Sequence, residues 1–262
     1  MSSIIKTEAV VLRSVDIRET SKVVTFYTRQ MGKVAGMVKG ARRPKNKYGS
    51  SLGPMSYVTI VIYKKEGRDV QTVAHCDLVK SFRHLYEDLD AMAVGMSLVE
   101  LVNIVSHDRE ENVPLFILLV NSLTALNAAT KNPTNVLYYF ELHCARVLGF
   151  QPSFDHCVSC QKVLNEVSQT QEYNFDIERG GLICSKCSFA DDRILRISAE
   201  VLKFFREVSA SHYDIHTVQE YEIDNHACST IHHFLWCYLQ YHVHDMRALK
   251  SEKVFGKILT TA

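Results

Sequence analysis

Four cysteines have the spacing of a metal site. Cys157, Cys160, Cys184 and Cys187 form the pattern C-x2-C-x23-C-x2-C. Each C-x2-C can fold as a knuckle whose two thiolates point at one ion, and two knuckles complete a tetrahedral zinc site. A single pair is also compatible with a redox or an accidental role, and disulfides are disfavoured because nothing indicates export. The pattern predicts one structural Zn²⁺ per chain, since four cysteine ligands leave no open coordination position.

The remaining cysteines give a weaker signal, and motifs for catalysis are missing. Cys76, Cys144, Cys228 and Cys237 have apolar neighbours, which is typical of small core residues. The sequence contains no G-x-x-x-x-G-K-[ST], G-x-G-x-x-G or G-x-S-x-G motif. We therefore expect a protein that is not an enzyme and binds no nucleotide.

A second candidate site is the basic stretch KGARRPKNKYG at residues 39–49, which has five positive charges and no acidic residue. Such a run can be a solvated loop or a surface that binds a polyanion. Residues 1–80 contain 15 basic and 6 acidic residues, a net charge of +9, whereas residues 81–262 have a net charge of −8. This asymmetry favours a polyanion-binding part joined to an acidic part with another role.

Length and composition limit the class of protein. The chain has 262 residues, of which 47% are hydrophobic, and this is enough for two or three domains with cores of their own. The first ten residues, MSSIIKTEAV, lack the long apolar segment of a signal peptide. The longest apolar run, residues 113–120, is too short to cross a bilayer. We expect a soluble cytoplasmic protein.

The elements that must position the basic stretch are strands. Short runs rich in Val, Ile, Thr and Tyr predict five of them, at Glu8–Val15, Lys22–Thr28, Lys33–Lys39, Tyr57–Tyr63 and Val70–Ala74. Gly36 lies inside a strand pattern, where glycine is typical of a bulge or a sharp bend. Five strands within residues 1–80 predict a small closed barrel such as the OB-fold, with an SH3-like barrel as the alternative.

The period becomes helical after residue 80. Apolar faces predict a helix through Val94 and Val105, another after Pro114, and a third that ends at Gly149. Ser198 is a candidate N-cap for a later helix, and an amphipathic helix follows through Ile231. We expect an α+β multidomain protein, with a zinc lobe inserted between helical segments. Its domains are a barrel at 1–80, a first helical part at 81–150, the zinc lobe at 151–192 and a second helical part at 193–262.

Several motifs in order resemble one family. They are ETS at 19–21, GKV at 32–34, KGAR at 39–42, LGFQPSFDHCVSC at 148–160, GGLICSKC at 180–187 and ALKS at 248–251. KGAR alone is weak, but the ordered set spans nearly the whole chain and resembles the bacterial recombination mediator family RecO.

The resemblance implies an N-terminal OB-fold, a helical lobe and a zinc lobe. It also implies a nucleoid-associated protein that binds single- and double-stranded DNA and anneals complementary strands. Such a protein would act with RecR to help RecA load onto DNA covered by single-strand-binding protein (SSB). The alternative function is a zinc-stabilised adaptor between proteins that does not itself bind DNA.

The resemblance also suggests which residues bind DNA and which bind the SSB tail. The loop residues match the family's basic barrel loop, and neighbouring cations extend it, so the candidate DNA-binding residues are Lys39, Arg42, Arg43, Lys45, Lys47, Arg13, Arg18, Lys22 and Lys33. Tyr27, Tyr48, Tyr57 and Tyr63 are candidates for stacking on bases. Relatives hold the acidic SSB tail on the helical lobe, but Tyr138 and Tyr139 stand where some members have arginine. The replacement candidates for that site are Arg146, Arg193, Arg196 and Lys203.

Overall fold

The computed structural model describes residues 2–164, 172–188, 193–210, 214–244, 246–251 and 254. The chain forms two compact units: unit 1 contains Met1–Ala128 with Leu249–Ser251, and unit 2 contains Ala129–Ala248 with Glu252–Ala262. The break after Ala128 lies inside the segment 81–150, which we expected to be one helical part. Within the described residues, no helix combines the length and the apolar character that a membrane span requires.

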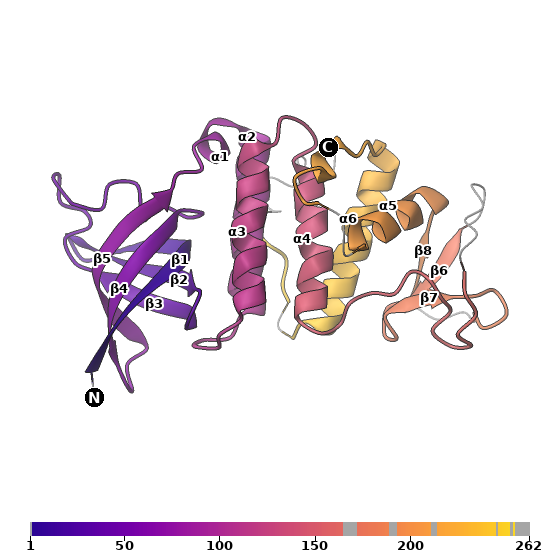
Figure 1. Cartoon of the computed structure of the whole chain (residues 1–262), viewed down its shortest axis with the longest axis horizontal. Coiled ribbons are helices and arrows are strands. Elements are labelled where there is room, and N and C mark those ends of the chain that lie inside the picture. The colour runs from indigo at the N-terminus through magenta and orange to yellow at the C-terminus, as the bar shows by residue number, and fades with distance from the viewer. Residues whose placement is uncertain are drawn as a thin grey trace. The chain divides into compact units, whose positions relative to one another are not determined.

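Unit 1 begins with a closed five-stranded barrel (Figure 1), which confirms the predicted OB-like fold. Its strands are β1 (Ser2–Ile17), β2 (Ser21–Thr28), β3 (Gly32–Val38), β4 (Tyr57–Lys65) and β5 (Val70–Lys80). β1 is longer than expected because its first half pairs with β4 and its second half pairs with β2. A register shift between Val11 and Arg13 marks the change of partner. Val11 belongs to the barrel cluster, whereas the adjacent Leu12 is buried outside it, so both faces of β1 are covered here.

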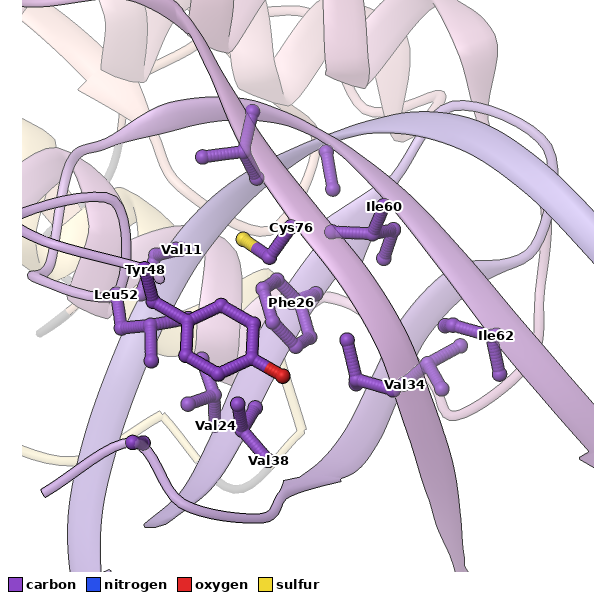
Figure 2. Close-up of a cluster of buried hydrophobic side chains, with 14 residues drawn as sticks. Val11, Val24, Phe26, Val34, Val38, Tyr48, Leu52, Ile60, Ile62 and Cys76 are labelled. Atoms are coloured by element: carbon purple, nitrogen blue, oxygen red, sulfur yellow. The ribbon is translucent and has the colours of Figure 1, made fainter. Parts of the chain in front are cut away.

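The barrel interior is filled by alternate residues of all five strands. Phe26 lies among Val24, Val34 and Ile60 in this cluster (Figure 2). Tyr48 and Leu52 belong to the same cluster, although both come from the long connection between β3 and β4. The segment that contains the basic stretch is therefore fastened to the barrel core by two apolar side chains.

Closure of the barrel depends on a short parallel contact between β3 and β5. It covers three residue pairs, from Ala35 opposite Val70 to Met37 opposite Thr72. A Cβ atom on Gly36 would lie 2.5 Å from Cγ2 of Val73 and 3.1 Å from the ring of Phe26. The pairing of β2 with β3 runs through Gly36 without a register shift, so the bulge expected there is wrong. This glycine instead leaves room inside the barrel for the side chains of Val73 and Phe26.

Three helices complete unit 1: α1 (His84–Glu87), α2 (Leu89–Val105) and α3 (Val113–Ala128). Asp88 caps α2 by accepting a 2.8 Å hydrogen bond from the N–H of Ala91. The apolar face predicted for α2 is buried along its whole length. A Cβ on Gly95 of this helix would lie 2.5 Å from Sδ of Met55, so the glycine permits close packing on the barrel side.

The short segment Leu249–Ser251 is held in unit 1 by α2. The carboxylate of Glu100 accepts hydrogen bonds from the N–H groups of Lys250 and Ser251, each 2.9 Å long. The hydroxyl of Ser251 lies 3.1 Å from the same carboxylate and 3.0 Å from the hydroxyl of Ser97. Because Leu249 is buried, the ALKS motif has a structural role in tying a distant segment to this helix.

Unit 2 combines helices with a small sheet (Figure 1). The helices are α4 (Thr134–Val147), α5 (Ala199–Ser209) and α6 (Asn225–His242), with a 3₁₀ turn, η1, at Val218–Glu220. The strands β6 (Tyr173–Asp176), β7 (Gly181–Ile183) and β8 (Ile194–Ile197) form a sheet in the order β7-β6-β8. Two predicted helix ends are confirmed: Ser198 caps α5, and Gly149 follows α4 with a φ of 91°.

Aromatic rings form the core of unit 2. Phe154 precedes the first cysteine knuckle and stacks on Phe205 of α5 with the ring centroids 5.0 Å apart. Phe175 of β6 meets Phe234 of α6 edge to face at 4.8 Å. Tyr238 of α6 donates a 2.7 Å hydrogen bond to the carbonyl oxygen of Phe150. The cysteine-containing segment thus shares its apolar core with helices α5 and α6.

The close contact at Gly36 generates a stability prediction. Replacing Gly36 with Ala should lower the free energy of unfolding by about 1–3 kcal/mol, because the new methyl group overlaps Val73. Combining it with Val73→Ala should cost less than the sum of the two single changes, since the second change removes the overlapping atom. Urea unfolding of the three variants measures this coupling.

Gly67→Asn is the matched control for this glycine replacement. Gly67 has a φ of 73°, which asparagine tolerates, and no atom lies within 4 Å of a Cβ built there. Its stability should change little. Strictly additive costs for Gly36→Ala and Val73→Ala would show that the closing strands do not depend on the glycine.

Candidate nucleic-acid interface and metal centre

The basic stretch forms a loop whose backbone is held by hydrogen bonds. The side-chain oxygen of Asn46 accepts hydrogen bonds from the N–H groups of Tyr48 (2.9 Å) and Gly49 (3.0 Å). Ala41 and Tyr48 are buried in the barrel core at either end of the turn. All five basic side chains of the loop are exposed: Lys39, Arg42, Arg43, Lys45 and Lys47. Burial of the apolar residues therefore turns the charged ones toward solvent.

Arg42 joins this loop to the turn between β1 and β2. Its backbone N–H donates to the carbonyl oxygen of Thr20 at 3.1 Å, and its Nη1 donates to that of Arg18 at 2.9 Å. Its Nε lies 3.2 Å from a carboxylate oxygen of Asp16, whose other oxygen lies 3.2 Å from Nζ of Lys22. Two segments that are separate in the sequence thus form one cationic surface, with an acidic residue between two of its cations.

The hollow on this surface is broad and open. It is lined by the β1–β2 turn and by the start of the loop, with Arg18, Lys39, Arg42 and Arg43 on its walls and Glu19 beside them. Several guanidinium and ammonium groups facing one open hollow are suited to bind the phosphates of an extended polyanion. We call these residues, together with Lys22, the basic surface.

Lys47 is exposed, but its ammonium group binds the barrel itself. Its Nζ donates a 3.0 Å hydrogen bond to the carbonyl oxygen of Ala74 on β5 and lies 5.3 Å from the centre of the Tyr48 ring. Lys45 is exposed nearby on the loop, and Arg13 is exposed on β1 next to the bulge. Neither Lys45 nor Arg13 lines the hollow of the basic surface.

Lys33 lies apart from the basic surface. Its side chain is 18% exposed and its Nζ donates a 2.9 Å hydrogen bond to the carbonyl oxygen of Asn103, with Asp108 at 3.7 Å. The backbone carbonyl of Lys33 also accepts a hydrogen bond from the N–H of Arg109. These contacts fasten the loop before α3 to the barrel. The DNA contact proposed for Lys33 stays a prediction. The bond of its ammonium group to Asn103 does not favour it.

For two of the four tyrosines, the prediction that they stack on bases is wrong. Tyr27 and Tyr48 are buried in the interior of unit 1, so neither ring has a free face. Tyr57 donates a 2.5 Å hydrogen bond to Glu8, and burial together with this bond raises the pKa of Tyr57 to about 12. Tyr63 is exposed on β4. The spacing of aromatic residues does not reveal which rings point inward when strands close into a barrel.

The four predicted metal ligands converge. The sulfur atoms of Cys157, Cys160, Cys184 and Cys187 all lie within 4.8 Å of one another. The first knuckle is tied to the β6–β7 hairpin by a 2.8 Å hydrogen bond from the N–H of Val158 to the carbonyl oxygen of Leu182. A Cβ on Gly181 would lie 2.3 Å from Cγ1 of Val158. The glycine in GGLICSKC therefore allows the two knuckles to meet.

The electrostatics of this cluster suit a cation. Burial opposes ionisation of Cys157, but donation from the N–H groups of Cys184, Cys160 and Ser159 outweighs it and lowers the pKa of the thiol to about 6. Hydrogen bonds to the sulfurs of Cys184 and Cys160 raise the pKa of Cys187 to about 12. Four thiolates this close repel one another unless a positive ion lies among them. The donor set and the tight grouping match a closed four-sulfur site.

The sequence did not indicate that Arg206 of α5 binds the segment around the first cysteine knuckle. Its Nε donates a 2.9 Å hydrogen bond to the carbonyl oxygen of Phe154, and its Nη2 donates to that of Leu164. Asp155 lies 3.8 Å from the same guanidinium. Arg206 thus holds both flanks of the first knuckle. Its sequence neighbours resemble those of any amphipathic helix, so no local pattern could have indicated this role.

The four candidates for the partner site lie on different elements of unit 2. Arg146 is on α4, Lys203 on α5, Arg196 on β8 and Arg193 just before it. Three of them pair with an acidic residue: Arg193 with Glu178, Arg196 with Glu172 at 3.6 Å, and Lys203 with Glu207 at 3.9 Å. Tyr138 is buried, and Tyr139 stacks on His143 with the ring centroids 3.9 Å apart.

Comparisons with known proteins agree with the motifs. A family model described as "Recombination protein O N terminal" matches residues 1–82, and one described as "Recombination protein O C terminal" matches residues 86–252. Three similar proteins are each named "DNA repair protein RecO".

These relatives differ in how much of each chain is aligned. The one from Salinibacter ruber is 42% identical over 58% of this chain and 59% of its own length. The one from Chloroherpeton thalassium is 28% identical over 97% of this chain and 98% of its own. The one from Pelodictyon phaeoclathratiforme is 36% identical over 71% and 72%. Because the two family models together cover the barrel, the helices and the cysteine cluster in order, the chain belongs to the RecO family of DNA repair proteins.

Proposed function

We propose that this chain is a recombination mediator that binds single- and double-stranded DNA through the basic surface of its barrel. Membership of the family gives it a role in DNA repair and recombination. The observation that carries the proposal is the union of the 39–49 loop with the β1–β2 turn through Arg42, which gathers cations from two segments around one hollow.

Phosphate contacts of this kind bind without reading sequence. Each Lys or Arg that neutralises a phosphate releases condensed counterions, so affinity comes largely from charge and falls steeply with salt. Neutralising two complementary strands lowers their mutual repulsion and lets base pairs form. Annealing by this route makes and breaks no covalent bond, in keeping with a mediator rather than an enzyme.

The proposed partners divide between the two units. Unit 1 would hold DNA, while unit 2, with Arg146, Arg193, Arg196 and Lys203, would receive the acidic C-terminal tail of SSB. Acting with RecR, the protein would then help RecA to load onto SSB-covered single strands in the nucleoid. Unit 2 contains 12 basic and 16 acidic residues, and this net charge of −4 argues for a local cationic pocket there rather than a broad positive field.

The proposed metal is one structural Zn²⁺ held by Cys157, Cys160, Cys184 and Cys187. When bound, it would link the first knuckle to the β6–β7 hairpin as a tetrahedral crosslink. The residues of the chain contribute the rest: backbone N–H groups stabilise the thiolates, and Arg206 fixes the segment before and after the first knuckle.

The first functional prediction concerns the basic surface. Lys39→Glu combined with Arg43→Glu should weaken binding of single-stranded DNA equally for all base sequences. The slope of log affinity against log salt should become shallower by roughly one to two units, because fewer counterions are displaced. Fluorescence anisotropy with labelled oligonucleotides at several salt concentrations measures both. Arg42 is avoided, because its guanidinium also braces the β1–β2 turn.

Lys162→Glu with Arg247→Glu provides the matched control, since both side chains are exposed in unit 2 and the change of charge is the same. This control should bind and anneal DNA normally. If the Lys39 and Arg43 variant folds and anneals strands at the wild-type rate, the loop is a solvated segment. If the wild-type protein does not bind DNA at moderate salt, the adaptor function is favoured instead.

The second prediction concerns the metal. The purified protein should contain about one zinc per chain, and Cys184→Ser should lose the metal and lower the melting temperature. Cys237→Ser is the control, because this half-exposed cysteine lies on α6 outside the cluster. Elemental analysis and thermal unfolding give the two readouts. A metal-free preparation that melts like the zinc-containing one would contradict a structural ion.

The third prediction concerns the SSB tail. A peptide with the sequence of the tail should bind with micromolar affinity that decreases with salt, and Arg146→Glu should weaken it by reversing an exposed charge on α4. Calorimetry with the peptide and with SSB lacking its tail tests this. Equal binding of the tailless SSB would mean that the tail is not what unit 2 recognises.

A further inference from the structure

We propose that a second hollow, next to the basic surface, holds one unstacked nucleobase of single-stranded DNA. This inference rests on the proposed DNA-binding function and adds a base-binding subsite to it. The hollow has a volume of about 460 Å³ and lies within unit 1, between residues 49–56, the end of β5 and helix α1. Pockets of a few hundred Å³ are large enough for a small organic ligand.

The lining of this hollow is mainly apolar. Leu52, Met55 and Phe82 are buried side chains at its base. Leu78 and Tyr86, which are 43% and 51% exposed, stand at its edge. These two side chains extend the apolar lining of the hollow to its edge. Tyr86 presents a free aromatic face of the kind on which bases stack.

The ring of Tyr86 is held in a defined position. Its hydroxyl donates a hydrogen bond to the carbonyl oxygen of Pro54, and burial raises the pKa of this hydroxyl. The turn that contains Pro54 is itself fixed to β1 by a 2.8 Å hydrogen bond from the N–H of Met55 to the carbonyl oxygen of Val11. A fixed ring loses little conformational entropy when a base stacks on it.

The hollow lies beside the hollow of the basic surface. Lys22 and Ala41 line one side of it, while their immediate neighbours Ser21, Gly40 and Arg42 line the hollow of the basic surface. The two hollows are therefore separated only by the paired segments that Arg42 joins. A nucleotide whose phosphate contacts Arg42 or Arg43 can place its base across this ridge.

Three cations and one acidic residue line the hollow, and the cations already have contacts: Lys22 lies 3.2 Å from Asp16, and Nζ of Lys80 lies 5.6 Å from the centre of the Phe82 ring. Glu87 contributes a carboxylate to the lining, and its oxygen lies 2.5 Å from Nε of Arg83, which offsets that cation. The hydroxyls of Ser50 and Ser81 also line the hollow, and a hydroxyl can donate to or accept from any base edge. A nucleobase combines an apolar face with such edges and so suits the apolar floor, while Lys22 and Lys80 can face the phosphates of the same strand.

A base in this hollow would make binding sensitive to strandedness. Bases of a duplex are stacked and paired, so only a single strand, or one from which a base has been turned out, can supply one. Phosphate contacts alone do not make this distinction. The hollow would thus favour single strands and would release its base when the complementary strand pairs with it.

The experiment compares two oligomers of equal length and charge: oligothymidylate and a strand of abasic residues. The wild-type protein should bind oligothymidylate about five- to tenfold more tightly, as expected for stacking of one base. Tyr86→Ala and Leu78→Ala should each reduce this preference at fixed salt, leaving the salt dependence unchanged. Lys39→Glu with Arg43→Glu should weaken both oligomers and keep the preference.

Tyr241→Ala is the matched control, because this tyrosine is 49% exposed but lies on α6 in unit 2. It should keep the wild-type preference, and thermal unfolding should find all three single variants folded. Equal wild-type binding of the two oligomers, or an undiminished preference in both Tyr86→Ala and Leu78→Ala, would overturn the base site alone. No binding of either oligomer by the wild-type protein would overturn the proposed DNA-binding function.

Discussion

The short parallel contact between β3 and β5, where Gly36 leaves room for the side chains of Val73 and Phe26, is the constraint on which unit 1 depends. This parallel contact covers three residue pairs, yet it closes the barrel and sets where β3 ends. The loop that follows can then insert Tyr48 and Leu52 into the same core. A larger residue than glycine would overlap Val73 and Phe26, which belong to the same core cluster as these two anchors of the loop. The position of the cationic groups is thus a consequence of apolar packing inside the barrel.

Asp16 orients a cation of the basic surface. Its carboxylate pairs with Lys22 and Arg42, and such exposed pairs contribute little stability individually. Their main effect here is geometric, because Arg42 is oriented while it also donates to the backbone of the β1–β2 turn. Lys39 and Arg43 line the same hollow and supply further charge. The surface therefore combines Arg42, which is oriented by these bonds, with exposed cations around the same hollow.

Unit 2 joins its cysteine lobe to the helices in two ways. The rings of Phe154 and Phe175 pack against α5 and α6, and Arg206 binds backbone carbonyl groups on both flanks of the first knuckle. The aromatic contacts remove apolar area from water, while the hydrogen bonds fix the direction in which the knuckle points. A metal ion at the four sulfurs would add a crosslink to a lobe that already shares a core with its neighbours.

The sequence by itself determined the five strands, the helices and the four cysteines, because strand period, helix period and knuckle spacing are local patterns. It also located the basic loop, since charge is read directly from composition. It could not show that Lys33 binds Asn103, that Tyr27 and Tyr48 point inward, or that Gly36 serves a close contact. Those outcomes depend on which strands pair when the barrel closes. Only the tertiary structure brought Arg18 and Arg42 together and opened a hollow beside Leu78 and Tyr86, because the residues involved are far apart in the chain and meet only after folding.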